Sequence, residues 1–275
     1  MIVDYHMHLR APDESIDHTV GAIERFVETA RHRGVDEIAF TEHVYYFRAT
    51  RGLWELPYQT KRCVHELERY VEAVLEAKTR GLPVKLGLEV DYVGERQAEL
   101  ADLLHPYPWD LLLGSVHWLG GLAVDQEPGL WGEHSVEEVW RRYFAALGEL
   151  ARSGCVDVLA HPDLPKIFGR RPAPEVVTEL HAAAAEAAAD GAVAVEVSTA
   201  GLRKRVGELY PDQALLEACS ARGVPATIAS DAHVPGLVGE AFPAALDLLR
   251  RAGYETVTVF ERRSARQVPL PRGQV

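Results

Sequence analysis

Two short stretches of this sequence each place two side chains that can bind a metal ion at alternate positions. IVDYHMH ends with His6 and His8, and PATIASDAH ends with Asp231 and His233. Both stretches are apolar enough to form buried strands, and side chains two residues apart on a strand point to the same side. Neutral imidazole and carboxylate groups are ligands that suit Zn, Fe or Mn. The spacing therefore predicts that each pair is directed at one place, where a metal ion could be held.

Other apolar runs carry a histidine or a glutamate at or near their ends. In EIAFTEH, VKLGLEVDY, LLLGSVH and VDVLAHPD the residues concerned are His43, Glu89, His117 and His161. A single histidine after an apolar run is most often a structural residue, so none of these indicates a metal site by itself. The repetition is informative because the carboxyl ends of parallel strands meet at one edge of a sheet or barrel. The pattern predicts a site with several metal ions at that edge.

Apolar runs alternate with longer segments of helical periodicity along the chain. AVAVEVST and TVTVF complete the predicted strands, and helices are predicted in HTVGAIERFVETARHRG, KRCVHELERYVEAVLEAKTRG, VEEVWRRYFAALGELARSG and PEVVTELHAAAAEAAADG. Strands that are apolar throughout are buried on both faces, as in a parallel sheet covered by helices. The alternation indicates an α/β fold, either a barrel or a doubly wound sheet, in a single domain spanning residues 1–275. The C-terminal segment RRSARQVPLPRGQV lacks such a pattern, and we expect it to be a surface segment or loosely held.

The composition argues against several classes of protein. Of the 275 residues, 47% are hydrophobic and 25% are charged, which is typical of a soluble globular protein. No long apolar run and no signal peptide are visible, so we expect no membrane span and a cytoplasmic location. The net charge of −12 argues against a nucleic-acid-binding surface, and an anionic substrate would need local cations, which metal ions would supply. The three cysteines lie far apart and predict no disulfide framework.

The order of these motifs resembles the polymerase and histidinol phosphatase (PHP) superfamily, and within it the monofunctional histidinol phosphatases. The similarity lies in DYHMH, TEHV, GLEVDYV, WDLLLGSVHWL, LAHPDLPKIFG, VSTAGLRK, ELYP and ASDAHVPGLVG, which together span nearly the whole chain. The resemblance implies a distorted seven-stranded TIM-like (βα)7 barrel with three divalent metal ions, of Zn, Fe, Mn or a mixture. It also implies hydrolysis of L-histidinol phosphate to L-histidinol and phosphate, in histidine biosynthesis.

The resemblance further assigns the metal ligands, with Glu89 as the bridge between two ions. The first ion takes His6, His8, Glu89 and Asp231, and the second takes Glu89, His117 and His161. The third ion takes His43, His233 and a residue from the loop after the first strand. That loop, LRAPDESIDH, is longer than in the family. The aligned ninth ligand is His18, and Asp17 is its alternative.

Catalysis under this hypothesis needs no protein nucleophile, because a metal-bound hydroxide would attack phosphorus directly. We expect Glu89, Asp231 and His233 to take part in catalysis. The proton for the leaving group would come from His233, or from Asp231 through a water molecule, and the sequence leaves both open. The basic segments LPKIFGRR and AGLRKR follow two strands on the expected active-site side. With neighbouring motifs they predict a set of substrate-contacting residues: Lys166, Ser198, Arg203, Lys204, Tyr210 and Glu42.

Some positions depart from the family pattern or remain ambiguous. Glu42 stands where the family often has aspartate, which is compatible with an outer role in supporting the metal ligands. Ser198 stands where asparagine is common, so its contact with substrate is the less secure. An acid for the substrate ammonium group is expected among Glu42, Asp163 and Glu208, and the sequence does not select one of them.

Two alternative functions use the same residues. The first is a broad-specificity phosphoesterase or an exonuclease of the same superfamily, and the acidic composition argues against long nucleic acids as substrates. The second is a non-catalytic metal-binding module of a larger assembly, which would be expected to have lost ligands that this chain retains. A homo-oligomer is as compatible with the sequence as a monomer.

Overall fold

Seven parallel strands form the central sheet of the protein. The computed structural model describes residues 1–10 and 15–271. The strand order is β1-β2-β3-β4-β7-β8-β9, and every neighbouring pair is parallel. The bounds are β1 Val3–Asp4, β2 Glu37–Phe40, β3 Val84–Asp91, β4 Leu111–Ser115, β7 Val158–Leu159, β8 Ala194–Ser198 and β9 Ala226–Ala229. These strands confirm the α/β class and lie within the apolar runs that predicted them.

The first and last strands of this sheet lie next to each other. The backbone N–H of Tyr5 donates to the carbonyl oxygen of Ile228 (3.2 Å), and the N–H of His8 donates to that of Ala232 (2.8 Å). A parallel bridge between Met7 and Ala232 continues the pairing. The sheet is therefore a nearly closed barrel, as the resemblance to PHP proteins implied.

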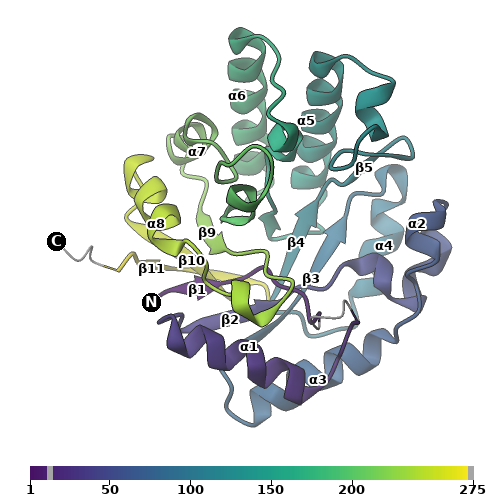
Figure 1. Cartoon of the computed structure of the whole chain (residues 1–275), viewed down its shortest axis with the longest axis vertical. Coiled ribbons are helices and arrows are strands. Elements are labelled where there is room, and N and C mark those ends of the chain that lie inside the picture. Colours follow the sequence, from purple (N-terminus) through teal and green to yellow (C-terminus); the bar gives the residue numbers. More distant parts are fainter. Residues whose placement is uncertain (11–14, 272–275) are drawn as a thin grey trace.

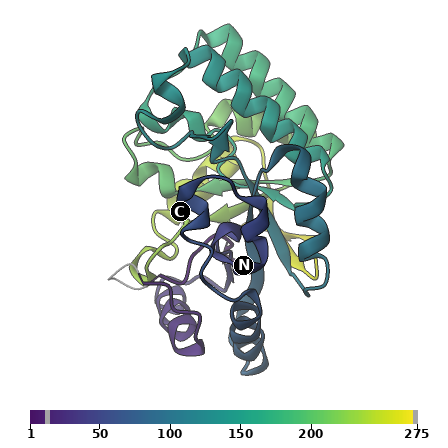
Figure 2. The same ribbon diagram turned by 90° about the vertical axis from the view of Figure 1, so that its right-hand side faces the viewer.

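Helices cover the outside of the barrel (Figures 1 and 2). Their bounds are α1 Val20–His32, α2 Pro57–Thr60, α3 Leu67–Thr79, α4 Gln97–Leu104, α5 Val136–Arg152, α6 Pro174–Asp190, α7 Gln213–Ser220 and α8 Phe242–Arg251. The four predicted helices correspond to α1, α3, α5 and α6. Among the described residues, no helix combines the length and apolar character required to cross a bilayer.

The C-terminal segment forms an antiparallel hairpin, in which β10 (Thr256–Glu261) pairs with β11 (Ser264–Pro269). The segment lies on the surface as expected, but the expectation that it is loosely held was wrong. At the turn, the N–H of Arg263 donates to the carbonyl oxygen of Asp110 (2.9 Å) and its guanidinium contacts Asp157 (3.0 Å). These aspartates precede β4 and β7, so the hairpin closes the amino-terminal end of the barrel. Residues 272–275 lie outside the described residues.

Gly191, which follows α6, lies against the end of α5 with no room for a side chain. A Cβ atom at Gly191 would lie 2.0 Å from the carbonyl oxygen of Ala151. We therefore expect Gly191→Ala to lower the free energy of unfolding by about 1–3 kcal/mol, measured by urea denaturation.

Gly148, in the interior of α5, provides the matched control. The nearest atoms to a Cβ at Gly148 lie at 3.4 and 3.6 Å, which is ordinary contact. Alanine is favoured over glycine inside a helix by about 0.5–1 kcal/mol, so Gly148→Ala should leave the protein unchanged or more stable. Equal destabilisation by both substitutions would contradict this account of the α5–α6 contact.

Candidate metal centre

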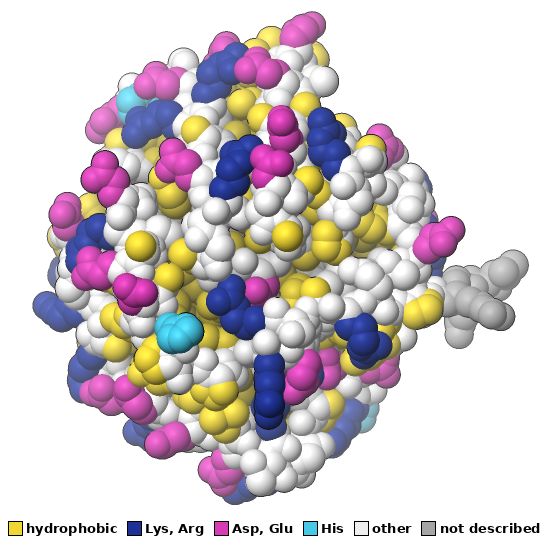
Figure 3. Space-filling view, turned by 180° about the vertical axis from the view of Figure 1, so that it is seen from behind, with side chains coloured by type: hydrophobic (Ala, Val, Ile, Leu, Met, Phe, Trp, Pro, Cys, Tyr) yellow, Lys and Arg dark blue, Asp and Glu magenta, His cyan; other side chains and the backbone are white. Residues whose placement is uncertain are grey.

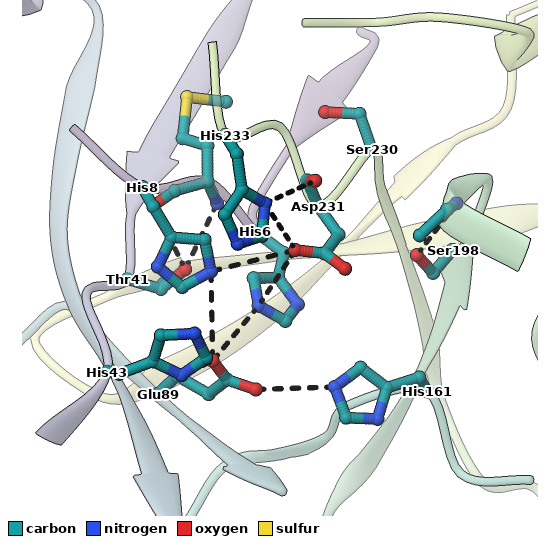
Figure 4. Close-up of polar contacts among 12 residues, drawn as sticks. His6, His8, Thr41, His43, Glu89, His161, Ser198, Ser230, Asp231 and His233 are labelled. Atoms are coloured by element: carbon teal, nitrogen blue, oxygen red, sulfur yellow. Dashed lines mark hydrogen bonds and ion pairs between the residues drawn. The ribbon is translucent and has the colours of Figure 1, made fainter. Parts of the chain in front are cut away.

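The carboxyl ends of the strands bring the predicted metal-binding residues together around one buried carboxylate, that of Glu89 on β3 (Figure 4). Three histidine nitrogens lie near its Oε2: Nδ1 of His43 at 2.6 Å, Nε2 of His6 at 3.5 Å and Nε2 of His8 at 3.7 Å. Two more lie near its Oε1: Nε2 of His161 at 3.2 Å and Nε2 of His117 at 3.5 Å. These residues come from the ends of five segments that are far apart in the sequence. The barrel therefore produces the convergence that the strand-end pattern predicted.

Asp231 and His233 complete the cluster from the segment after β9. Oδ1 of Asp231 lies 3.6 Å from Nε2 of His8, 3.8 Å from Nε2 of His6 and 3.4 Å from Nδ1 of His233. Asp231 has a φ of 50°, in the left-handed region that favours glycine. A non-glycine residue in that region costs roughly 1–2 kcal/mol, so the surrounding structure must stabilise this orientation of the carboxylate.

Arg203 supports the turn that presents Asp231. Its Nη2 donates to the carbonyl oxygens of Ser230 (2.7 Å) and Asp231 (3.1 Å), and its Nη1 lies 2.9 Å from a carboxylate oxygen of Glu240. The guanidinium is thus bonded to groups of the protein itself. Contact between Arg203 and substrate stays a prediction, and the observed bonds give this residue a positioning role.

The ligand atoms form groups compact enough to hold metal ions. Four overlapping groups have their ligand atoms within 4.8 Å of one another, namely His8, His43 and His233; His6, Glu89 and His161; His6, His8 and Asp231; and His43, Asp91 and His117. Among the described residues, no hydrogen-bond partner exists for the buried Nε2 of His6, either ring nitrogen of His8 or Oε2 of Glu89. Unpartnered buried atoms of this kind are costly, and a bound metal ion would satisfy them. The imidazole and carboxylate donors fit Zn, Fe or Mn.

The electrostatics of the cluster favour positive charge at its centre. Burial raises the pKa of Glu89, but the neighbouring histidines His43, His117 and His6 outweigh burial and hold the pKa well below its usual value. Burial lowers the pKa of His233 to about 3, and His8 adds to this effect. Both shifts favour the forms that bind metal, which are an ionised carboxylate and a neutral imidazole.

Two further buried carboxylates contact the Nδ1 atoms of histidines in the cluster and orient their rings. Oε2 of Glu196, on β8, lies 2.8 Å from Nδ1 of His6, and Oδ1 of Asp91, on β3, lies 2.8 Å from Nδ1 of His117. Such contacts direct the other ring nitrogen, Nε2, into the cluster. Burial lowers the pKa of His117, but Glu89 and Asp91 outweigh burial and raise the pKa to about 10. Sequence reasoning missed both supporting acids, although an acid inside an apolar strand, or two residues after Glu89, was an available signal.

Neither His18 nor Asp17 lies in the cluster. Nε2 of His18 lies 3.5 Å from Oε1 of Glu42, whose other oxygen lies 3.6 Å from Nδ1 of His8. Glu42 thus contacts both histidines and keeps the ring of His18 on its far side. The carboxylate of Asp17 lies 3.5 Å from the guanidinium of Arg25. The identity of a ninth ligand stays a prediction, and residues 11–14 of the same loop lie outside the described residues.

A pocket opens onto the cluster and is lined by two of the residues predicted to contact substrate, Lys204 and Tyr210. Arg10 and the aromatic residues Tyr45 and Tyr58 also line it. The ligand-bearing side of the pocket consists of His43, Glu89, His117, His161, Asp231 and His233. A molecule in this pocket would therefore contact the metal-binding residues on one side and cationic and aromatic side chains on the other.

Two other predicted substrate contacts lie beneath the pocket surface. The Nζ of Lys166 is fully buried, 2.8 Å from Oδ2 of Asp163, and it donates to the carbonyl oxygen of Leu209 (2.6 Å). Ser198 is buried and its backbone pairs with that of Tyr210. Neither residue is among those that line the pocket, and contact of either with substrate stays a prediction.

The three acids considered for a substrate ammonium group are all engaged within the protein. Glu42 contacts two histidines, Asp163 is paired with Lys166, and Glu208 is paired with Arg171. None of the three is among the residues that line the pocket.

Comparison with known proteins agrees with this geometry. A family model for the PHP domain matches residues 4–200. The chain belongs to the PHP family. It is 33% identical to a probable histidinol-phosphatase of Deinococcus radiodurans over 95% of this chain and 98% of that protein. It is 28% identical to the histidinol-phosphatase of Bacillus subtilis over 89% and 98% of the two chains.

A solved PHP relative has the same fold. The crystal structure of histidinol phosphate phosphatase from Lactococcus lactis, complexed with Zn, L-histidinol and phosphate, matches with a TM-score of 0.74. The match covers 96% of this chain and 98% of that one at 20% identity, so it compares the folds alone. The nearly closed barrel is thus the barrel of the PHP family.

Removal of the Glu89 charge should weaken metal binding by the cluster. We expect Glu89→Gln to reduce the metal content of the purified protein by at least one ion per chain, measured by elemental mass spectrometry, and to abolish turnover. Glu95→Gln is the matched control, because Glu95 is exposed and lies six residues along the chain. Retention of the full metal content by Glu89→Gln would refute the central role of this carboxylate.

Substitution of Glu196 tests whether the carboxylates that orient the histidines contribute to metal binding. Loss of its contact with His6 should weaken metal binding by about 10- to 100-fold in Glu196→Gln. The measurement is competition for the metal against a chelator of known affinity, with circular dichroism to verify folding. Glu186→Gln, an exposed position on α6, should retain wild-type affinity. If Glu196→Gln bound metal as tightly as the wild type, the orienting role would be ruled out.

Proposed function

We propose that this protein is a metal-dependent phosphomonoesterase that hydrolyses L-histidinol phosphate to L-histidinol and phosphate, in histidine biosynthesis. The observation that carries the proposal is the ring of histidines around the buried Glu89, which opens onto a pocket with cationic and aromatic lining. Relatives named histidinol-phosphatase align over nearly the full length of the chain and support the choice of substrate. A cytoplasmic location, where soluble biosynthetic intermediates occur, is part of the same proposal.

Three divalent ions, of Zn, Fe or Mn, would occupy the cluster under this proposal. The first would be held by His6, His8, Glu89 and Asp231, the second by Glu89, His117 and His161, and the third by His43, His233 and a ninth ligand, for which His18 or Asp17 was predicted. The Zn in the Lactococcus lactis structure supports metal binding of this type. When bound, such ions would activate water for attack on phosphorus and neutralise charge on the phosphate oxygens.

The residues of the chain itself would position the reactants. Glu89 would hold two ions at a fixed separation, and Lys204, at the pocket wall, would attract the phosphate dianion. Asp231 and His233 are the candidates for passing a proton to the leaving alkoxide, because they lie at the pocket surface beside the ligands. No serine or cysteine nucleophile is required, and each of the three cysteines is buried.

The exonuclease alternative is less well supported by the surface. On the face shown in Figure 3, the described Lys and Arg side chains lie among Asp and Glu side chains and form no continuous basic stripe. Long nucleic acids are bound mainly through such stripes. A small phosphate ester fits the pocket and this surface better.

A substrate panel tests the proposal directly. With Mn²⁺ or Zn²⁺ present, kcat/KM for L-histidinol phosphate should exceed that for phenyl phosphate, a nucleoside monophosphate and a single-stranded oligonucleotide by about 100-fold or more, since the bound organic group contributes to transition-state stabilisation. Chelation should abolish the activity, and added dications should restore it. Comparable values across the monoesters would favour the broad-specificity alternative. Activity that survives complete removal of metal would exclude the metal-dependent mechanism.

A further inference from the structure

The pocket beside the metal cluster contains an acid that sequence reasoning did not select. Asp125 directly follows the ribbon of β5 (Trp118–Leu119) and β6 (Leu122–Ala123) and lines the pocket with Glu89 and Asp231. Its Oδ1 is buried and has no hydrogen-bond partner within the described part of the chain. Unlike Glu42, Asp163 and Glu208, Asp125 lines the pocket itself. Asp125 is therefore positioned to bind a group that the protein does not itself supply.

The position of Asp125 is fixed relative to the metal cluster. The N–H of its neighbour Val124 donates to the carbonyl oxygen of the ligand His117 (2.9 Å), and the indole of Trp131 donates to the carbonyl oxygen of Val124 (2.7 Å). The Asp125 carboxylate also contributes to the raised pKa of His117. An ester whose phosphate is held at the cluster thus has its organic part within the pocket that Asp125 lines.

A second unpartnered group faces the same pocket. The side chain of Tyr210 is only 1% exposed, its hydroxyl has no hydrogen-bond partner among the described residues, and it lines the pocket. Buried polar atoms without partners are uncommon in folded proteins and usually indicate a missing ligand or water. Two such groups on one pocket indicate that its occupant is polar beyond its phosphate.

Aromatic side chains form another part of the same pocket, which we call the aromatic wall. Tyr58 lies with its ring centroid 5.0 Å from that of Trp118 and 6.0 Å from that of Tyr45, and all three residues line the pocket. Aromatic rings of this kind stack on flat ring systems and attract cations to their faces. A pocket lined by both a carboxylate and such rings favours an organic group that is both positively charged and aromatic.

We propose that Asp125 is the specificity residue for the ammonium group of the substrate, with the aromatic wall contacting its ring. The inference rests on the proposed function and adds the residue that distinguishes a phosphate ester of an amino alcohol from other phosphate esters. An ammonium group is the natural partner, because a carboxylate repels phosphate and the protein already carries a net charge of −12. Phosphate esters with a neutral or anionic organic part leave Asp125 unpaired and are bound less well.

The test compares two substrates in Asp125→Asn. The ratio of kcat/KM for L-histidinol phosphate to kcat/KM for phenyl phosphate should fall by about 10- to 100-fold, which is the worth of a hydrogen bond to a charged group. Asp125→Glu should recover part of the ratio. Glu127→Gln is the matched control, because exposed Glu127 is paired with Arg170 and Arg205, away from the pocket lining. Its ratio should equal that of the wild type.

Inhibition by the two products provides an independent measurement. In assays with phenyl phosphate, Asp125→Asn should raise the inhibition constant of L-histidinol by about 10- to 100-fold and that of inorganic phosphate by a much smaller factor. With 3-(imidazol-4-yl)propyl phosphate, which differs from L-histidinol phosphate only by the missing amino group, the substitution should change kcat/KM less than threefold. An equal loss with this analogue would overturn the assignment to the ammonium group.

The outcomes separate this inference from the proposed function. If the wild type prefers L-histidinol phosphate and Asp125→Asn keeps that preference unchanged, the role of Asp125 is refuted and the function stands. If the wild type shows no preference for L-histidinol phosphate, the proposed function fails, and the inference that rests on it fails as well.

Discussion

The structure depends on a carboxylate that has been removed from water, that of Glu89. An ionised carboxylate costs several kcal/mol to bury unless positive charge or hydrogen bonds replace its hydration. Here five histidine rings have a nitrogen within 3.7 Å of one of its oxygens. Neutral imidazoles cannot all donate to a single carboxylate, and several protonated imidazoles in one buried cluster would repel one another. Divalent ions between the rings and the carboxylate would resolve both problems, so the charge of the buried carboxylate and the capacity to bind metal are linked.

The barrel meets that requirement through its topology and through local strain. The carboxyl ends of the parallel strands lie at the same end of the barrel. The β10–β11 hairpin closes the other end through contacts with the residues that precede β4 and β7. Two of the predicted ligands, His161 and Asp231, have φ values of 30° and 50°, outside the regions that these residues favour. Such strained backbone conformations persist only where contacts with the surrounding structure hold them in place. Arg203, bonded to the carbonyl oxygens of residues 230 and 231, is part of those surroundings.

The parts of the fold and site that could be predicted from the sequence are those with a periodic signal. Apolar runs locate the strands, and the alternation of side chains on a strand predicts that His6 and His8 face the same place. The loop that contains His18 has no such signal, because counting along a longer loop does not determine where its side chains point. Single acids such as Glu196 and Asp125 lack a pattern as well, and only their partners, or the absence of partners, reveal their roles. The hairpin strand β11 was missed because Val268 is its single buried residue, so the strand has no alternating apolar pattern.

The candidate active site is formed by the ends of barrel strands and by segments outside the barrel, and the two have different roles. The metal cluster is built from the ends of barrel strands, whose positions are fixed by the backbone pairing of the whole sheet, and phosphate hydrolysis requires that rigidity. The aromatic wall of the pocket is built from the segment after β2 and from the β5–β6 ribbon, which do not contribute strands to the barrel. Substitutions in these segments can alter the organic group that fits without disturbing the sheet. A fold arranged in this way can keep its reaction while its substrate changes, so we expect the residues that line the aromatic wall, rather than the predicted metal ligands, to select the phosphate ester.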